Sequence, residues 1–216
     1  MTIEFGHFNY LAQTRVFAMY DAPGHVKYVP NAIVGASLAD YAGLVVSAKE
    51  GEYEMGFDKE GQTREHMLIA KVLGIEQVIV VVTKMDDVRW SESRFNYIKI
   101  NLLSLLLELG FKRTQISFIP ISGLTGQNVK WPIGNLCPWY KGWTLMQTLE
   151  FVPTKERDRK GPLKIPIIDK KEDGGVVIAQ GKIESGILRI GDKIFISPSG
   201  HPAEIGSILD YKKEPV

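Results

Sequence analysis

Four apolar runs in the first two-thirds of the chain have the length and spacing of buried β-strands. They cover Val16–Tyr20, Gly43–Ala48, Gln77–Val82 and Ile116–Ile121. Most of these runs are continuously apolar rather than alternating, which is typical of parallel strands that are covered on both faces. The sequence therefore predicts a parallel sheet buried between two layers.

Helical patterns separate these strands. One apolar repeat at helical spacing follows Ser91, a candidate N-cap, and ends before Gly110. Its apolar members are Phe95, Ile98, Leu102, Leu105 and Leu109. A second helix is predicted over Glu65–Leu73. Strands that alternate with helices indicate an α/β domain with a doubly wound parallel sheet.

The pattern changes after Glu150. Pro153 and the charged run Lys155–Lys160 are typical of a linker. The short segments beyond it, separated by glycine turns, predict an all-β domain that forms part of a barrel. These segments are Lys164–Ile168, Val176–Ile183, Lys193–Ser197 and Ala203–Leu209. We therefore expect a first domain over residues 1–154, a linker over 155–162 and a partial barrel over 163–216.

Composition narrows the class of protein only slightly. The 216 residues carry a net charge of +1, so charge alone indicates neither nucleic acid nor membrane as a partner. No apolar run approaches the roughly 20 residues that span a bilayer. The one cysteine, Cys137, cannot form an internal disulfide, which favours a reducing compartment. A cytoplasmic location is the expectation.

The first polar cluster, Asp21–His25, follows the first predicted strand. Asp21 could hold Mg²⁺ through water, because this ion keeps much of its hydration shell in proteins. Gly24 has no side chain, so its backbone N–H could approach a phosphate closely. His25 could orient an attacking water. The alternative is a strand that ends in a Pro-Gly turn, with a histidine at the surface.

Two further clusters follow later strands. In Thr83-Lys84-Met85-Asp86, the carboxylate of Asp86 could accept hydrogen bonds from N1–H and the exocyclic amine of guanine, a donor pair that adenine lacks. The stem of Lys84 could lie along the purine face. In Ser122-Gly123-Leu124, backbone N–H groups could meet the guanine O6. Each cluster alone could be an ordinary polar turn, but ligands of open α/β sheets bind beyond the carboxyl ends of the strands.

The order of the three clusters resembles the motif series of GTPases: D-x-P-G-H, then [NT]-K-x-D, then S-[GA]-x. Together with Tyr28–Asn31, Gly51-Glu52 and Gly61–His66, the chain is similar to translation-factor GTPases, in the branch that contains elongation factor one-alpha and release factor three. Thr2, in a Thr-Ile-Glu context, matches the switch-one threonine of that family. The resemblance implies that Thr2 contacts both Mg²⁺ and the γ-phosphate.

The resemblance also implies what the chain binds and does. GTP or GDP and Mg²⁺ are the expected cofactors. The base would be held by Thr83, Lys84 and Asp86 together with Ser122, Gly123 and Leu124. The phosphate side would be held by Thr2, Asp21 and Gly24. The catalytic water would be positioned by His25. Thr83 departs from the asparagine that is usual in this branch.

The family's phosphate loop, G-x-x-x-x-G-K-[ST], has no match in these 216 residues. That loop supplies the main phosphate-binding N–H groups and a lysine. We therefore expect an N-terminally truncated sheet of the phosphate-loop NTPase type, with impaired GTP binding and hydrolysis. A module that binds the ribosome or another factor without hydrolysing GTP remains the alternative from a different class.

Within the family, Asn135–Gly142 resembles the Cys-Pro-Trp segment of release factor three. The short connection Gly142–Leu145 leaves no room for the insertion of elongation factor one-alpha. The implied function is assistance of peptide-chain release, with the ribosome and a class-one release factor as partners. A ribosome-rescue GTPase and an aminoacyl-tRNA carrier like elongation factor one-alpha are the alternatives.

Overall fold

A computed structural model of the chain describes residues 6–12, 14–21, 29–57 and 62–209. The chain divides into two units, Met1–Pro153 and Thr154–Val216, each with its own internal contacts. They are described separately below.

The first unit is built on a three-stranded parallel sheet. Its strands are β3 (Tyr41–Ser47), β4 (Gln77–Thr83) and β5 (Ile116–Pro120), in the order β3-β4-β5. The register pairs Ser47 with Thr83 and Val82 with Pro120, so the carboxyl ends of all three strands lie at one edge. The central strand β4 is buried from Val78 to Val82, which confirms the expectation drawn from its continuous apolar run.

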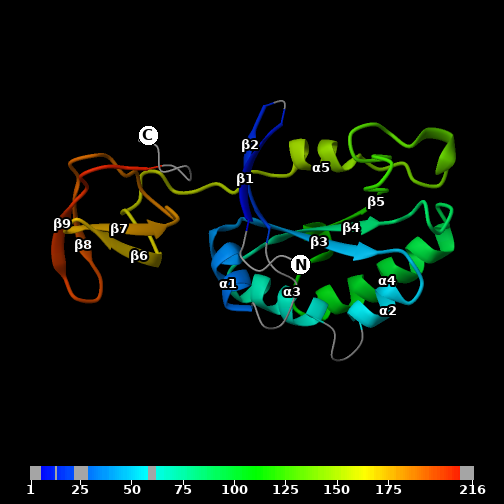
Figure 1. The fold of residues 1–216 in the computed structure, drawn as a ribbon, viewed down its shortest axis with the longest axis horizontal. Coiled ribbons are helices and arrows are strands. Elements are labelled where there is room, and N and C mark those ends of the chain that lie inside the picture. The colour runs from blue at the N-terminus through cyan, green and yellow to red at the C-terminus, as the bar shows by residue number, and fades with distance from the viewer. Residues whose placement is uncertain (1–5, 13, 22–28, 58–61, 210–216) are drawn as a thin grey trace. The chain divides into compact units, whose positions relative to one another are not determined.

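Helices cover both faces of this sheet, so the predicted α/β fold is confirmed. Figure 1 places α5 (Leu145–Phe151) above the sheet in that view and the other labelled helices below it. These are α1 (Val29–Leu38), α2 (Glu52–Phe57), α3 (Gln62–Val72) and α4 (Glu92–Glu108). Short 3₁₀ turns at Arg113–Gln115 and Gly134–Leu136 also lie in the first unit.

Each face of the sheet has its own apolar cluster. On one face Val80 and Val82 pack with Ile98 and Leu102 of α4, all fully buried. Burial of each such side chain contributes about 1.5–3 kcal/mol. On the other face Ile79, Val81, Ile119 and Ile121 pack with Leu145 and Leu149 of α5. The alternation of β4 side chains between the two clusters is what fixes the sheet between its helical layers.

The long helix α4 begins and ends where its sequence predicts. Ser91 is the N-cap, and its Oγ accepts a hydrogen bond from the Arg94 amide at 3.3 Å. The helix stops before Gly110, whose φ of 87° suits glycine far better than a residue with a Cβ. The helix predicted over Glu65–Leu73 is also present, but α3 already begins at Gln62.

The prediction for Val16–Tyr20 was right about the strand and wrong about its place. This run forms β2 (Val16–Asp21), which pairs antiparallel with β1 (Gly6–Leu11) and not with the parallel sheet. Val16 is 63% exposed, so the strand is not buried as expected. The turn between the two strands closes with a 2.8 Å bond from the Ala12 amide to the Arg15 carbonyl. An apolar run indicates a strand but does not determine which other strand it pairs with.

The second unit contains two antiparallel pairs. The strands are β6 (Ile167–Asp173), β7 (Val176–Gly181), β8 (Lys193–Ile196) and β9 (His201–Glu204), with β6 pairing β7 and β8 pairing β9. These sheets are not closed among the residues described. The prediction located β7 and β8 well. It placed β6 too early, at Lys164–Ile168, and β9 too late, at Ala203–Leu209.

The charged stretch before these strands is attached to the second unit. The amide of Gly186 donates to the carbonyl of Asp158 at 2.9 Å, and the Ser185 hydroxyl donates to the carbonyl of Pro162. Lys155 also lies 3.9 Å from a carboxylate oxygen of Glu184.

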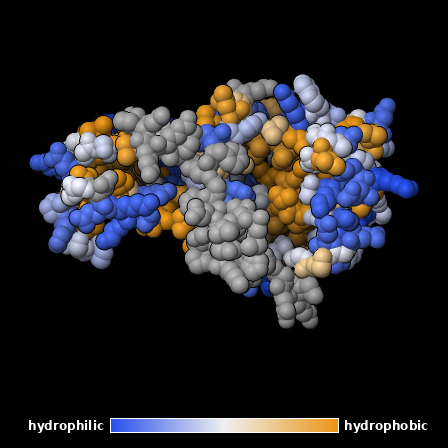
Figure 2. Space-filling view, in the orientation of Figure 1, coloured by the Kyte–Doolittle hydropathy of each residue, from blue (hydrophilic) through white to orange (hydrophobic). Residues whose placement is uncertain are grey.

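Apolar side chains remain exposed on both units. Figure 2 shows apolar surface over the strand-rich region of the first unit and scattered over the second. Val45 on β3 is 64% exposed, and Val176 and Val177 on β7 are each 63% exposed. Among the described helices none is both long and apolar enough to cross a bilayer.

Candidate functional site

Two of the three polar clusters lie side by side at the carboxyl edge of the parallel sheet. The Met85 amide donates to the carbonyl of Ile121 at 3.2 Å, and the Ile121 amide donates to the carbonyl of Val82 at 2.8 Å. A Cβ added to Gly123 would lie 3.6 Å from Oγ1 of Thr83. The connections that follow β4 and β5 therefore form one continuous surface.

The turn after β4 leaves Asp86 half-buried. Met85 is completely buried and anchors the turn in the core. Lys84 has a φ of 57°, a left-handed conformation that reverses the chain directly after the strand. The carbonyl of Asp86 accepts from the Arg89 amide at 3.0 Å. Within the described residues, the Asp86 carboxylate has no hydrogen-bond or ion-pair partner, so it can accept donors from a ligand.

The loop after β5 is held from within. The amide of Ser122 donates to the carbonyl of Gln127 at 3.1 Å, and its hydroxyl accepts from the Thr125 amide at 3.2 Å. Ser122 is completely buried, whereas Leu124 is 90% exposed. Ser122 therefore shapes the loop with its own polar groups, and Gly123 and Leu124 form the exposed part of the loop.

Sequence reasoning missed a second residue that shapes this loop. Asn128 is 1% exposed, and its Nδ2 donates to the carbonyl of Pro120 at 2.7 Å. Its φ of 57° is a conformation that asparagine adopts more readily than most residues. The Gly126-Gln127-Asn128 run is the signal that could have identified a tight turn here.

A carboxylate from the neighbouring connection contacts the lysine of the second cluster. Nζ of Lys84 lies 2.6 Å from Oε2 of Glu52, the first residue of α2. The hydrogen bond from Lys84 holds the pKa of Glu52 below its ordinary value. The same contact raises the pKa of Lys84. The sequence alone indicated no role for Glu52, because nothing local reports that β3 and β4 are neighbours.

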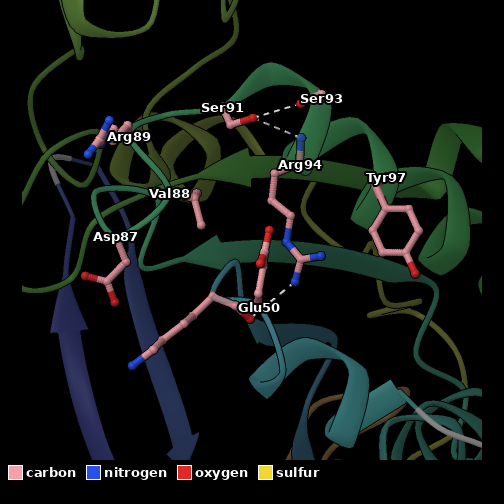
Figure 3. A pocket seen from close by; sticks show the side chains of 9 residues that line it. Glu50, Asp87, Val88, Arg89, Ser91, Ser93, Arg94 and Tyr97 are labelled. Carbon is pink, nitrogen blue, oxygen red and sulfur yellow. Dashed lines mark hydrogen bonds between the residues drawn. The ribbon is translucent and has the colours of Figure 1, made fainter.

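Arg94 ties the β3–α2 connection to α4. Its guanidinium donates to the carbonyls of Ala48 at 2.7 Å and Lys49 at 3.2 Å, and forms a two-point contact with Glu54 at 2.7 and 3.2 Å. The guanidinium also lies over the rings of Tyr53 and Tyr97. In Figure 3 the Arg94 side chain reaches from α4 into an open pocket toward the turn that carries Glu50.

Of the first polar cluster, only Asp21 belongs to the described residues. Asp21 is the last residue of β2 and is exposed, and its register partner is Gly6 of the antiparallel pair. Thr2, Gly24 and His25 lie outside the described residues. The expected convergence of all three clusters is therefore seen only for the two that follow β4 and β5.

Of the two candidate metal ligands, Asp21 belongs to the described part of the chain and Thr2 does not. The described part contains no group of three or more His, Cys, Asp or Glu side chains arranged to hold a metal ion. The assignment of Mg²⁺ to Thr2 and Asp21 stays a prediction from sequence.

A family model, related proteins and solved structures all place the chain in the same protein family. Residues 1–163 match the family model described as the elongation factor Tu GTP binding domain. The chain is 43% identical over 209 residues to elongation factor 1-alpha of Thermofilum pendens, covering 96% of this chain and 48% of that protein. It is 42% identical over 216 residues to the eukaryotic peptide chain release factor GTP-binding subunit of Debaryomyces hansenii, covering 99% of this chain and 31% of that protein.

A solved structure of Sup35 complexed with GMPPNP is also similar. It matches with a TM-score of 0.59 and 35% identity, over 97% of this chain and 49% of that one. The chain thus spans less than half of the length of each relative named here.

Proposed function

Since the chain belongs to the family of the elongation factor Tu GTP binding domain, we propose that it binds the base of a guanine nucleotide at the carboxyl edge of its parallel sheet. One observation carries the proposal. The Asp86 carboxylate has no partner among the described residues, and it stands in a turn that is hydrogen-bonded to the strand end leading into the Ser122–Leu124 loop.

Base recognition follows from the chemistry of these groups. The Asp86 carboxylate accepts from N1–H and the exocyclic amine of guanine, and both bonds are strengthened by its charge. Adenine offers no such pair of donors. The amides of Gly123 and Leu124 face the guanine O6. The stem of Lys84, whose side chain is 46% exposed, lies along the purine face.

The phosphate side of the site is proposed from sequence alone. Asp21 and Thr2 hold Mg²⁺, and Gly24 approaches the γ-phosphate with its backbone N–H. His25 orients the water that attacks. When bound there, Mg²⁺ would supply positive charge to the phosphate oxygens. Loss of the γ-phosphate would release Thr2 and Gly24, and such release is the usual origin of switching in GTPases.

Within the family, we propose a role in peptide-chain release, with the ribosome and a class-one release factor as partners. The Cys-Pro-Trp segment supports this role, and two of its residues are anchored in the first unit. Cys137 is completely buried, and the indole N–H of Trp139 donates to the carbonyl of Trp90 at 2.9 Å. The chain then enters α5 directly through its N-cap Thr144. An aminoacyl-tRNA carrier and a ribosome-rescue GTPase are the alternatives within the family.

Isothermal titration with GDP and ADP tests the proposed base site. We expect GDP to bind more tightly than ADP, because only guanine satisfies Asp86. Since these 216 residues contain no phosphate loop, we expect a dissociation constant for GDP weaker than about 1 μM, equivalent to roughly −8 kcal/mol. Equal binding of GDP and ADP would refute the base site.

A pull-down distinguishes the family members. We expect the chain, joined to the rest of its translation factor, to retain a class-one release factor more strongly than aminoacyl-tRNA. Preferential retention of aminoacyl-tRNA would favour the carrier instead.

A further inference from the structure

The Lys84 ammonium is held by a group outside its own turn. Nζ of Lys84 lies 2.6 Å from Oε2 of Glu52. The other carboxylate oxygen of Glu52 lies 3.7 Å from Nζ of Lys49, so the Lys84 contact is the closer of the two. The lysine stem itself remains accessible, because the Lys84 side chain is 46% exposed.

Glu52 in turn has a well-defined position. It is the first residue of α2 and follows Gly51, whose φ of 83° turns the chain sharply at this point. The connection between β3 and α2 is joined to α4 by hydrogen bonds from Arg94 to the carbonyls of Ala48 and Lys49.

We propose that Glu52 is a positioning residue of the guanine site, which holds the Lys84 ammonium so that the lysine stem is fixed beside the purine. This inference rests on the proposed function of Lys84 and Asp86. A free lysine stem has four rotatable bonds and must be ordered when a base binds. Glu52 orders it beforehand, and preorganisation of this kind improves affinity without a new contact to the ligand.

The role predicts a specific pattern of selectivity. The stem of Lys84 contacts the purine face, which all purines share, whereas Asp86 contacts the edge that distinguishes guanine. Loss of Glu52 should therefore weaken guanine and xanthine nucleotides by the same factor. Loss of the Asp86 carboxylate should instead change their ratio.

The first test needs no nucleotide. Amine acetylation of the 216-residue chain, followed by mass spectrometry of the Lys84 peptide, reports how freely that ammonium is available. Glu52→Gln should speed acetylation of Lys84, because the freed amine loses the partner that favours its protonated form. Glu50→Gln removes one carboxylate from the same turn and serves as the matched control. Equal acetylation of Lys84 in parent and Glu52→Gln would overturn the proposal.

The second test is a double-mutant cycle in GDP binding, measured by titration calorimetry. Glu52→Gln should weaken GDP by about two- to fivefold, the range that an exposed ion pair supports, and should leave the ratio of GDP to XDP affinity unchanged. In a Lys84→Met background, Glu52→Gln should have no further effect. An equal loss in both backgrounds would show that Glu52 acts through the fold and not through Lys84.

The two hypotheses fail in different ways. If the parent chain binds GDP and Glu52→Gln binds it equally well, the positioning role is wrong and the base site stands. If the parent chain binds no guanine nucleotide, the proposed function is wrong and the positioning role falls with it.

Discussion

The amide of Met85 donates a 3.2 Å hydrogen bond to the carbonyl oxygen of Ile121. This bond joins the turn after β4 to the turn after β5. The Met85 side chain is buried and anchors the first of these turns in the core. Asp86 follows directly in the chain, and Ser122 follows Ile121. The two turns that carry the carboxylate and the loop amides are therefore joined directly by a backbone hydrogen bond.

Asp86→Asn should change base selectivity. The amide side chain offers a donor where guanine also offers donors, so GDP affinity should fall by about 1.5–3 kcal/mol, the usual contribution of hydrogen bonds to charged groups. Xanthine carries a carbonyl at that position, so XDP should bind the variant better than GDP. Calorimetric titration of both nucleotides measures the reversal. Glu50→Gln is the charge-matched control, and unchanged GDP affinity in Asp86→Asn would disprove the assignment.

His25→Ala should slow GTP hydrolysis on ribosomes and leave nucleotide affinity close to that of the parent. His25 follows the proposed γ-phosphate contact Gly24, so its loss should affect the positioning of water rather than binding. The measurement is single-turnover hydrolysis with added ribosomes, in a version of the protein that carries a phosphate loop. A parental hydrolysis rate in His25→Ala would exclude the catalytic role.

Arg94→Ala should destabilise the first unit. It removes the donors to the Ala48 and Lys49 carbonyls together with the contact to Glu54, and the Arg94 side chain is only 12% exposed. We expect a loss of about 1.5–3 kcal/mol in the free energy of unfolding, measured by urea titration. Arg94→Lys should recover little of this stability, because an ammonium cannot reproduce the planar arrangement of N–H donors of the guanidinium.

The matched control for Arg94 is Arg64→Ala, which breaks the exposed pair between Arg64 and Glu108. Its cost should stay within about 1 kcal/mol. Similar losses for Arg94→Ala and Arg64→Ala would contradict the anchoring role of Arg94.

Stability should fall in acid partly because of Glu54. The hydrogen bond from Arg94 lowers the pKa of Glu54 from 4.5 to about 2 in the folded chain. A lowered folded pKa stabilises the fold above the unfolded value, and this contribution is lost as the pH falls from 4.5 toward about 2. Glu54→Gln should therefore be less stable than the parent at pH 6 and approach it at pH 3, in urea titrations at both values. A difference that does not change with pH would argue against the ion pair.

Local patterns in the sequence were enough to predict the helix α4 and the strands of the parallel sheet. The cap at Ser91, the stop at Gly110 and the buried run of β4 each depend on residues a few positions apart in the chain, so they can be identified without knowing the fold. The same is true of the two clusters after β4 and β5. Strand ends of a parallel sheet meet at one edge by rule.

Partners distant in the chain were decided only by the tertiary structure. Val16–Asp21 has the composition of a buried strand, yet it pairs with Gly6–Leu11. The local sequence does not determine which strand will lie beside it. Glu52 and Lys84 belong to separate connections, and their ion pair exists because the register of β3 with β4 brings Ser47 opposite Thr83. Residue type and spacing determine what a segment can form, whereas the packing of the sheet determines which charged group meets which.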